Sequence, residues 1–194
     1  MYMKIIVASN NRHKIKEISA VLKGSVRLVT MAEAGIHEDI PENEPGLEGN
    51  ALEKARYVHR RTGENVFADD TGLETEAMNG APGVHSARYA GDSKDSDANI
   101  KKLLHELQGH ENRRARFRTV IALIFNKQEY LFEGIINGRI INEKRGEHGF
   151  GYDPVFIPER ETLTFAEMSS EKKNTISHRA IAINKLCKFL QENL

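Results

Sequence analysis

The chain has 194 residues, of which 29% are charged and 39% hydrophobic, an ordinary balance for a globular protein with a sizeable core. Because 28 Lys and Arg residues balance 28 Asp and Glu residues, the formal net charge is zero. A neutral chain lacks the broad positive surface of a general nucleic-acid binder, which leaves only a local basic patch to consider. The single cysteine, Cys187, excludes an intrachain disulfide and a multi-cysteine zinc site.

The apolar segments are too short for a membrane protein. The central run from Val120 to Phe125 is far below the roughly 18 residues that a membrane span needs. The chain begins with a strand-like run, Ile5 to Ala8, without a signal-peptide pattern. We therefore expect a soluble, cytoplasmic protein that binds neither membranes nor nucleic acid. No repeat or linker divides the sequence, so we expect a single domain over residues 1–194.

The N-terminal part of the chain has a βαβ-like pattern. It predicts a strand at 4–8, a polar turn at 9–13, a helix at 14–22 and a strand at 26–30. Strands connected in this way are usually parallel. A polar stretch at 35–46 then leads into a predicted helix at 47–61. A short predicted strand at 65–68 ends at the sequence Asp69-Asp70-Thr71-Gly72.

The second half predicts a long hairpin between two helices. The helix at 96–107 places Ile100, Leu103, Leu104 and Leu107 on one face. Two strand-like runs follow at 116–125 and 129–141, joined by residues 126–128. A final amphipathic helix at 176–190 turns Ile183, Leu186 and Leu190 inward. Alternating strands and helices with an inserted hairpin indicate an α/β fold with a mixed sheet.

The segment "SNNRHK", Ser9 to Lys14, connects the first predicted strand to the first helix. Free N–H groups and the positive end of the helix dipole form an anion site at such a position, and Lys14 adds a full positive charge. Ser9, Asn10 and Asn11 add side-chain donors. Simple capping of the helix by Asn10 or Asn11 is the alternative, because the segment lacks the glycines of a phosphate-binding loop.

The segment "FADDTGL" places two adjacent carboxylates, Asp69 and Asp70, where the predicted strand ends. In an extended chain neighbouring side chains point to opposite faces, so both acids reach one point only if the strand has ended. One acid can then hold a metal while the other orients or deprotonates a water, at a strand end where catalytic groups of α/β proteins gather. The alternative is an Asp-Thr-Gly turn with solvated acids.

An acidic stretch at residues 37–44 includes Glu42 and Glu44. Magnesium binds one or two protein carboxylates together with phosphate oxygens, so this stretch could complete a magnesium site with the aspartate pair. A solvated acidic loop is the alternative.

The segment "EKKNTISHR", Glu171 to Arg179, contains a cluster of donors. Ser177 is a candidate N-cap of the last helix, which places His178 and Arg179 in its first turn, with Lys173 just before. Donors there can reach the oxygens or ring nitrogens of a ligand. A charged histidine is disfavoured at a helix N-terminus, so we expect neutral His178. A basic surface turn is the alternative.

The segment "HGFGYDPVF", His148 to Phe156, combines two aromatic residues with glycine and proline in a turn. Aromatic rings on a rigid loop form a stacking platform for a flat base, and Asp153 or the loop backbone can contact the edge of that base. The alternative places Phe150 in the core beneath the loop. A phosphate-binding turn, paired carboxylates and a base platform together indicate a nucleotide site.

Five motifs in this order resemble those of the inosine/xanthosine triphosphate pyrophosphatases: "SNNRHK", "ADDTGL", "APGVHSARYAG", "HGFGYDPVF" and "EKKNTISHR". The resemblance extends from about residue 4 to residue 190. It implies two lobes around a long mixed β-sheet with flanking helices, an active site in the cleft between the lobes, and a homodimer. It further implies magnesium-dependent hydrolysis of the deaminated purine nucleotides ITP, dITP and XTP to the monophosphate and pyrophosphate, which removes them from the nucleotide pool.

The resemblance also implies roles for individual residues. Asp70 matches the proton acceptor and metal partner, with Asp69 beside it, and Glu42 matches a metal-binding glutamate. Several other positions are implied to contact substrate: the triphosphate-binding turn Ser9, Asn10, Asn11, Arg12, His13 and Lys14, the phosphate-contacting Lys54, Thr71 at a position often held by serine, and on the base and sugar side Phe150, Gly151, Tyr152, Asp153, Lys173, His178 and Arg179.

Two departures from the family pattern matter for the phosphate and metal contacts. Asn10 stands where glycine is common, which bears on how closely phosphate approaches the backbone. Asn43-Glu44-Pro45 replaces a small-residue continuation, so the choice between Glu42 and Glu44 as the metal ligand stays open.

The residues suggest a mechanism. Magnesium, Lys14 and the helix N-terminus neutralise the triphosphate, while ionised Asp70 acts on a positioned water. Donors from His178, Arg179 or the loop suit the 6-oxo group and N7 of hypoxanthine or xanthine.

The sequence leaves two alternative functions open. A Maf-like pyrophosphatase with a similar fold would act on other nucleotides, including pyrimidine ones, and the "FGYD" and "SHR" segments argue against it. A nucleotide-sensing or RNA-contacting module would bind without turnover, and the paired aspartates and zero net charge argue against that. A zinc deaminase is disfavoured by the single cysteine.

Overall fold

The computed structural model describes residues 3–21 and 26–193. Its strands are β1 (Lys4–Val7), β2 (Arg27–Thr30), β3 (Val66–Thr75), β4 (Pro82–Gly83), β5 (Arg114–Phe125), β6 (Gln128–Ile140) and β7 (Phe156–Pro158). Its α-helices are α1 (Arg12–Val21), α2 (Leu47–Thr62), α3 (Ser96–Glu106), α4 (Ser170–Ile176) and α5 (His178–Asn193). Short 3₁₀ turns occur at Glu76–Met78, Ser86–Arg88 and Asp153–Val155.

The strands form one mixed sheet in the order β2-β1-β3-β5-β6-β7, with β4 beside β3. Strand β1 is parallel to β2, with Lys4 opposite Arg27, and parallel to β3, with Ile6 opposite Val66. The pairs β3–β4 and β6–β7 are antiparallel. The predicted α/β fold with a mixed sheet is therefore confirmed, and so is the parallel pairing expected from the βαβ-like opening.

The chain divides into two compact units. Unit 1 consists of Met1–Asp70, Thr119–Gly134 and Arg179–Leu194, and unit 2 consists of Thr71–Arg118 and Ile135–His178. The boundary falls within two of the predicted motifs, between Asp70 and Thr71 and between His178 and Arg179. The extent of a single domain over residues 1–194 stays a prediction.

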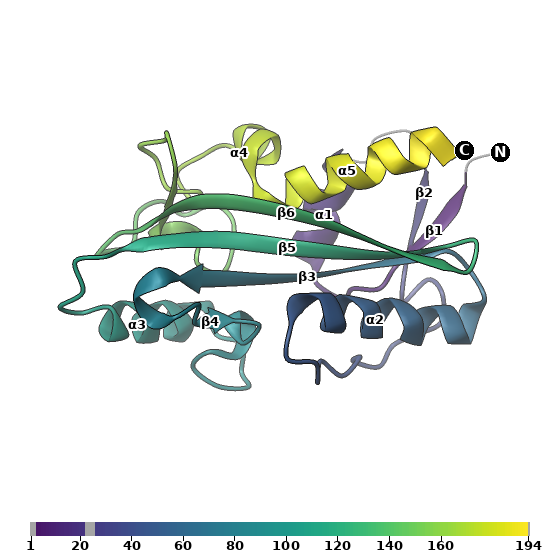
Figure 1. Ribbon diagram of the computed structural model, residues 1–194, viewed down its shortest axis with the longest axis horizontal. Coiled ribbons are helices and arrows are strands. Elements are labelled where there is room, and N and C mark those ends of the chain that lie inside the picture. The colour runs from purple at the N-terminus through teal and green to yellow at the C-terminus, as the bar shows by residue number, and fades with distance from the viewer. Residues whose placement is uncertain (1–2, 22–25, 194) are drawn as a thin grey trace. The chain divides into compact units, whose positions relative to one another are not determined.

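In unit 1 the strands have helices on both faces. Figure 1 shows α1 and α5 on one side of these strands and α2 on the other. Side chains alternate along a strand, so Ile5, Val7 and Phe67 join the core formed with α1 and α5, while Ile6 is buried outside that core. Burial on both faces explains why β5 is buried at nearly every position beyond Arg118. The inward positions expected on the last helix are confirmed, because Ile183, Leu186 and Leu190 are each fully buried.

The core of unit 2 is rich in aromatic rings. Phe117 of β5 and Phe156 of β7 have ring centroids 4.7 Å apart in an edge-to-face arrangement, and Phe165 adds a third ring. Helix α3 contributes Ile100 and Leu103 to the same core, Leu107 joins them from the C-cap position, and Leu104 packs against this core partly buried. The apolar face predicted for this helix is therefore confirmed.

Strand β3 corrects the prediction that a strand ends at Ala68. The strand runs ten residues and includes Asp69, Asp70 and Gly72. Gly72 acts here through close packing: a Cβ at this position would lie 2.5 Å from the carbonyl oxygen of Gly83 in β4. The sequence "DDTG" resembles a turn, but antiparallel pairing of Leu73 with Gly83 keeps the chain extended.

The C-terminal helical region also differs from the prediction of one helix at 176–190. Two helices, α4 and α5, meet at Ser177, whose backbone is extended at φ −66° and ψ 154°. Lys173, which was expected just before the last helix, therefore belongs to a separate helix, α4. The last helix starts at His178 and not at Ile176, which agrees with the placement of His178 and Arg179 in its first turn.

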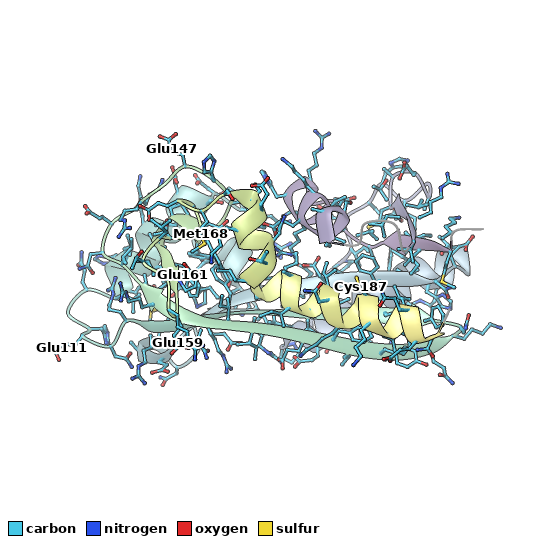
Figure 2. All side chains as sticks on the ribbon, turned by 90° about the horizontal axis from the view of Figure 1, so that it is seen from above. Glu111, Glu147, Glu159, Glu161, Met168 and Cys187 are labelled. Atoms are coloured by element: carbon cyan, nitrogen blue, oxygen red, sulfur yellow. The ribbon has the colours of Figure 1, made fainter. Side chains whose placement is uncertain are left out.

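Cys187 lies on α5 (Figure 2) and packs against the core of unit 1. Burial raises the pKa of its thiol. Across residues 3–21 and 26–193, no helix combines the length and apolar character that a membrane crossing requires.

Candidate active site

The turn that leads into α1 is organised around Asn11. Its side-chain oxygen accepts hydrogen bonds from the backbone N–H groups of His13 at 3.0 Å and Lys14 at 3.2 Å. Ser9 accepts a further bond from the N–H of Asn11 at 3.2 Å. Asn11 is thus the N-cap that the sequence offered as an alternative to phosphate binding. Two N–H groups of the helix start are therefore already occupied, and the cationic side chains of Arg12 and Lys14 are the charged groups that this turn offers to an anion.

Asp69 lies on the face of β3 that meets α1 and α5. Its side chain is fully buried, and its Oδ2 atom is 3.0 Å from Lys14 Nζ and 3.5 Å from Arg179 Nε. Arg179, at the start of α5, also forms an ion pair with Glu17 of α1. Burial alone would raise the pKa of Asp69, but Lys14, then Arg179 and Lys54, lower that pKa well below its usual range. Asp69 is therefore ionised and holds two cations in place.

Asp70 lies on the other face of β3, toward α2. Its Oδ1 atom is 3.0 Å from Lys54 Nζ, and its Oδ2 atom accepts a hydrogen bond from the Asn50 amide at 3.3 Å. The same Lys54 nitrogen is 2.9 Å from Glu42 Oε1. Asn50 and Lys54 are four residues apart, so both lie on one face of α2. Two acids from separate segments thus meet at one ammonium group.

The charge balance at Lys54 follows from this geometry. Burial would lower the pKa of Lys54, but the nearby carboxylates of Asp70, Glu42 and Asp69 raise it above its ordinary value. Lys54 is therefore charged at neutral pH. Two carboxylates contact this one ammonium group, so the site has an excess of negative charge that a further cation can balance.

These carboxylates suit a magnesium ion. Hard oxygen ligands are the ones that magnesium prefers, and one or two protein carboxylates suffice when phosphate oxygens complete the coordination. Glu42 and Asp70 supply such a pair, since one oxygen of each lies within 3.0 Å of the same Lys54 nitrogen. Asp69 is not brought together with them. In the described residues 3–21 and 26–193, no three His, Cys, Asp or Glu side chains gather as a metal site by themselves.

The aromatic loop at 149–153 is closed by Asp153. Its Oδ2 atom accepts hydrogen bonds from the N–H of Phe150 at 2.8 Å and from Lys173 Nζ at 2.7 Å. Gly149 has φ +78°, and a Cβ there would lie 2.0 Å from the same carboxylate oxygen. Lys173 Nζ is 5.1 Å from the ring centroid of Phe150. Asp153 therefore braces the loop from within, whereas the sequence suggested that it could contact a base.

The remaining loop residues divide between structure and surface. Tyr152 is buried, and its hydroxyl donates to the backbone carbonyl of Ser86 at 2.9 Å. Burial, which is the main cause, raises the pKa of Tyr152. Phe150 is half-buried, and Gly151 has φ +60°. Phe150 is thus the loop ring that remains partly accessible, as a stacking surface requires.

His178 is packed against an aromatic ring in unit 2. Its imidazole stacks on Phe117 with centroids 4.6 Å apart and planes 10° from parallel, and only 3% of the residue is exposed. This packing fixes the plane of the imidazole and therefore the directions in which its ring nitrogens point. Thr71 begins the unit 2 part of β3 and is half-buried.

The structure thus brings the predicted residues together in three groups: Lys14, Asp69 and Arg179; Glu42, Lys54 and Asp70; and Phe150, Asp153 and Lys173. Arg12 and His13 are exposed, and the side-chain amide of Asn10 donates to Asp39 Oδ1 at 3.5 Å.

Three residues that contact the site were not predicted as functional from the sequence: Asn50, Glu17 and Phe117. The spacing of Asn50 and Lys54 on a predicted helix was a usable signal for Asn50. Glu17 and Phe117 gave no local signal, because their roles depend on contacts with residues far away in the chain.

Solved structures define the class of this protein. A Ham1 protein from Staphylococcus aureus matches with a TM-score of 0.90 and 39% identity, covering 98% of this chain and 100% of that one. A structure titled nucleoside-triphosphatase / dITP/XTP pyrophosphatase, from Mycobacterium abscessus, matches with a TM-score of 0.78 and 41% identity over 95% and 98% of the two chains. The fold is therefore that of the Ham1 proteins.

The chain belongs to the Ham1 family, whose model matches residues 5–189. A protein named dITP/XTP pyrophosphatase from Porphyromonas gingivalis is 57% identical over 188 residues, which cover 96% of this chain and 97% of that protein. One of the same name from Bacillus subtilis is 45% identical over 96% of each chain. The predicted family is thus confirmed across both units.

Proposed function

We propose that this protein is a magnesium-dependent pyrophosphatase that hydrolyses deaminated purine nucleoside triphosphates, dITP, ITP and XTP, to the monophosphate and pyrophosphate. The protein is an enzyme of the nucleoside triphosphate pyrophosphatase class, as its relatives at 45–57% identity over nearly their whole length are named. The observation that carries the proposal is the meeting of Glu42 and Asp70 at Lys54, a site that concentrates acids as magnesium–phosphate chemistry requires.

In this mechanism the side chains of unit 1 act on the triphosphate and on the attacking water. Magnesium, when bound by Glu42 and Asp70, supplies positive charge to the phosphate oxygens. Lys14 binds the triphosphate, and Lys54 contributes a second cation next to Asp70. Asp70 orients the attacking water and accepts its proton. A carboxylate is a weak base, so positioning and charge stabilisation supply most of the acceleration.

The residues of unit 2 recognise the base. The Phe150 ring stacks on the purine, and Lys173 and Asp153 hold the loop that carries this ring. His178 donates a ring N–H to the 6-oxo group. Adenine presents an amino group at position 6 and leaves that donor unpaired, which disfavours ATP and dATP.

Steady-state kinetics with a panel of nucleotides tests this specificity. The panel contains dITP, XTP, GTP, ATP and dTTP, each with Mg²⁺, and kcat/KM is compared. The proposal expects values for dITP and XTP at least about 10²-fold above that for ATP, because adenine lacks the 6-oxo group. Preference for dTTP would support the Maf-like alternative, and binding of dITP without turnover would support the nucleotide-sensing alternative. The homodimer and the cytoplasmic location stay predictions.

A further inference from the structure

The start of helix α2 lies beneath the loop that carries Glu42. Asn50, in this first part of the helix, is 3% exposed. Its side-chain oxygen accepts a hydrogen bond from the backbone N–H of Glu44 at 3.0 Å, and its side-chain nitrogen donates to Asp70 Oδ2 at 3.3 Å. One buried amide therefore connects the acidic loop to the carboxylate on β3.

Gly49 makes a second contact between the helix and this loop. A Cβ at position 49 would lie 2.6 Å from Cβ of Glu44 and 2.8 Å from its Cγ. These atoms are close to the backbone of Glu44, so a methyl group could be accommodated only by moving the loop itself. Because glycine has no side chain, Glu44 can pack directly against the helix at Gly49.

The contacts of Asp70 show what this arrangement controls. Lys54 contacts one oxygen of Asp70 and Asn50 contacts the other. With both oxygens held, the carboxylate cannot rotate freely. Lys54 also contacts Glu42, two residues before the Glu44 N–H that Asn50 binds. Positions 49, 50 and 54 of one helix therefore fix two acids that come from separate segments.

We propose that Asn50 and Gly49 are positioning residues that set the separation and orientation of Glu42 and Asp70 for the metal. This inference rests on the proposed function, because it assigns these two acids to magnesium. Asn50 acts by holding Asp70 and residue 44 together, and Gly49 acts by letting the loop sit against the helix. Groups that orient metal ligands in this way typically change metal affinity or activity by about 10- to 100-fold when they are removed.

The first test is Asn50→Ala. Binding of Mn²⁺, as a probe for Mg²⁺, is measured by electron paramagnetic resonance without nucleotide, and kcat and KM for dITP are measured separately. We expect Mn²⁺ affinity and kcat each to fall about 10- to 100-fold. The KM for dITP should change much less, because base recognition is assigned to unit 2. Arg60→Gln is the matched control, since Arg60 is an exposed cation on the same helix.

The second test is Gly49→Ala, which separates positioning from stability. Alanine favours a helix more than glycine does, so a simple effect on α2 would stabilise the protein. We expect instead that Gly49→Ala binds Mn²⁺ more weakly and has a lower kcat than wild type. Its melting temperature should be equal to or above that of Asn50→Ala. Circular dichroism spectra and melting temperatures identify any variant that does not fold. If one variant does not fold, the other one tests the positioning role.

The outcomes distinguish this inference from the proposed function. Folded Asn50→Ala and Gly49→Ala proteins with Mn²⁺ affinity and kcat within twofold of wild type would overturn the inference, and so would a wild-type protein that binds no Mn²⁺. A wild-type protein that binds Mn²⁺ but does not hydrolyse dITP would refute the proposed function. In that case, weaker Mn²⁺ binding by the two variants would still support the positioning role.

Discussion

Asp69 and Asp70 are adjacent in the chain, yet their carboxylates point to opposite faces of strand β3. Asp69 meets Lys14 and Arg179 on the side of α1 and α5, and Asp70 meets Lys54 on the side of α2 (Figure 1). The strand continues through both residues, so the alternation of an extended chain separates them. The "DD" motif therefore supplies two acids to two different clusters.

This separation predicts different effects of the two amide substitutions on catalysis. Asp70→Asn removes the proton acceptor and one metal ligand, so kcat for dITP should fall on the order of 10²- to 10⁴-fold with little change in KM. Steady-state kinetics on the purified, folded variant gives both constants. Near wild-type turnover would remove Asp70 from the mechanism.

Asp69→Asn should instead act mainly on stability. It leaves Lys14 and Arg179 without their shared carboxylate in a buried position, and breaking a buried pair in this way typically costs about 3–5 kcal/mol. Urea unfolding at pH 7 measures the change in the free energy of unfolding. A variant within about 0.5 kcal/mol of wild type would show that the cluster does not support the fold.

The lowered pKa of Asp69 gives this effect a pH dependence. A carboxylate with a folded-state pKa below its unfolded value of about 3.9 stabilises the protein above that value, and this contribution is lost as the pH falls toward the folded pKa. The difference in unfolding free energy between wild type and Asp69→Asn should therefore shrink below about pH 5. Unfolding curves between about pH 2.5 and pH 7 cover the range in which this contribution is lost, and a constant difference over that range would contradict it.

Phe150→Ala tests the stacking platform. Loss of one base–aromatic stacking contact is typically about 1–3 kcal/mol, so KM for dITP should rise about 5- to 100-fold. The value of kcat should stay within a few fold, because Phe150 is assigned to base binding and not to the reacting phosphates. Phe150→Leu, which keeps an apolar side chain, is the matched control for burial. Equal KM values for wild type and Phe150→Ala would place the ring in the core alone.

His178→Ala tests base discrimination. The imidazole is held in one plane by Phe117, so its removal should lower kcat/KM for dITP more than for dATP. The ratio of the two kcat/KM values is the measured quantity, and it should fall at least about tenfold. A Phe117→Leu variant, in which the imidazole loses its stacking partner, should move the ratio in the same direction by less. An unchanged ratio in His178→Ala would assign discrimination to other groups.

Much of the fold could be predicted because periodicity and turn residues are local. The parallel opening, α2, α3, the hairpin strands and the start of α5 at His178 all follow from spacing and capping. The path of β3 could not be predicted in this way. Gly72 is recognised as a strand residue from the close approach of the Gly83 backbone. That contact joins residues eleven positions apart, so local sequence does not reveal it.

The candidate site was predictable in its residue types but not in its partners. The motifs identified Lys14, Asp69, Asp70 and Lys173 as chemically important. They could not show that Asp153 faces into its own loop, or that Arg179 pairs with Asp69 and Glu17. Such partners depend on where separate segments meet in three dimensions.

The central claim is tested most directly by identifying the phosphate product of dITP. The wild-type protein is incubated with dITP and Mg²⁺, and the products are followed by phosphorus NMR, with Asp70→Asn as the parallel sample. The account predicts deoxyinosine monophosphate and pyrophosphate in equal amounts from wild type and almost no product from the variant. Deoxyinosine diphosphate with orthophosphate, or equal turnover by both proteins, would contradict it.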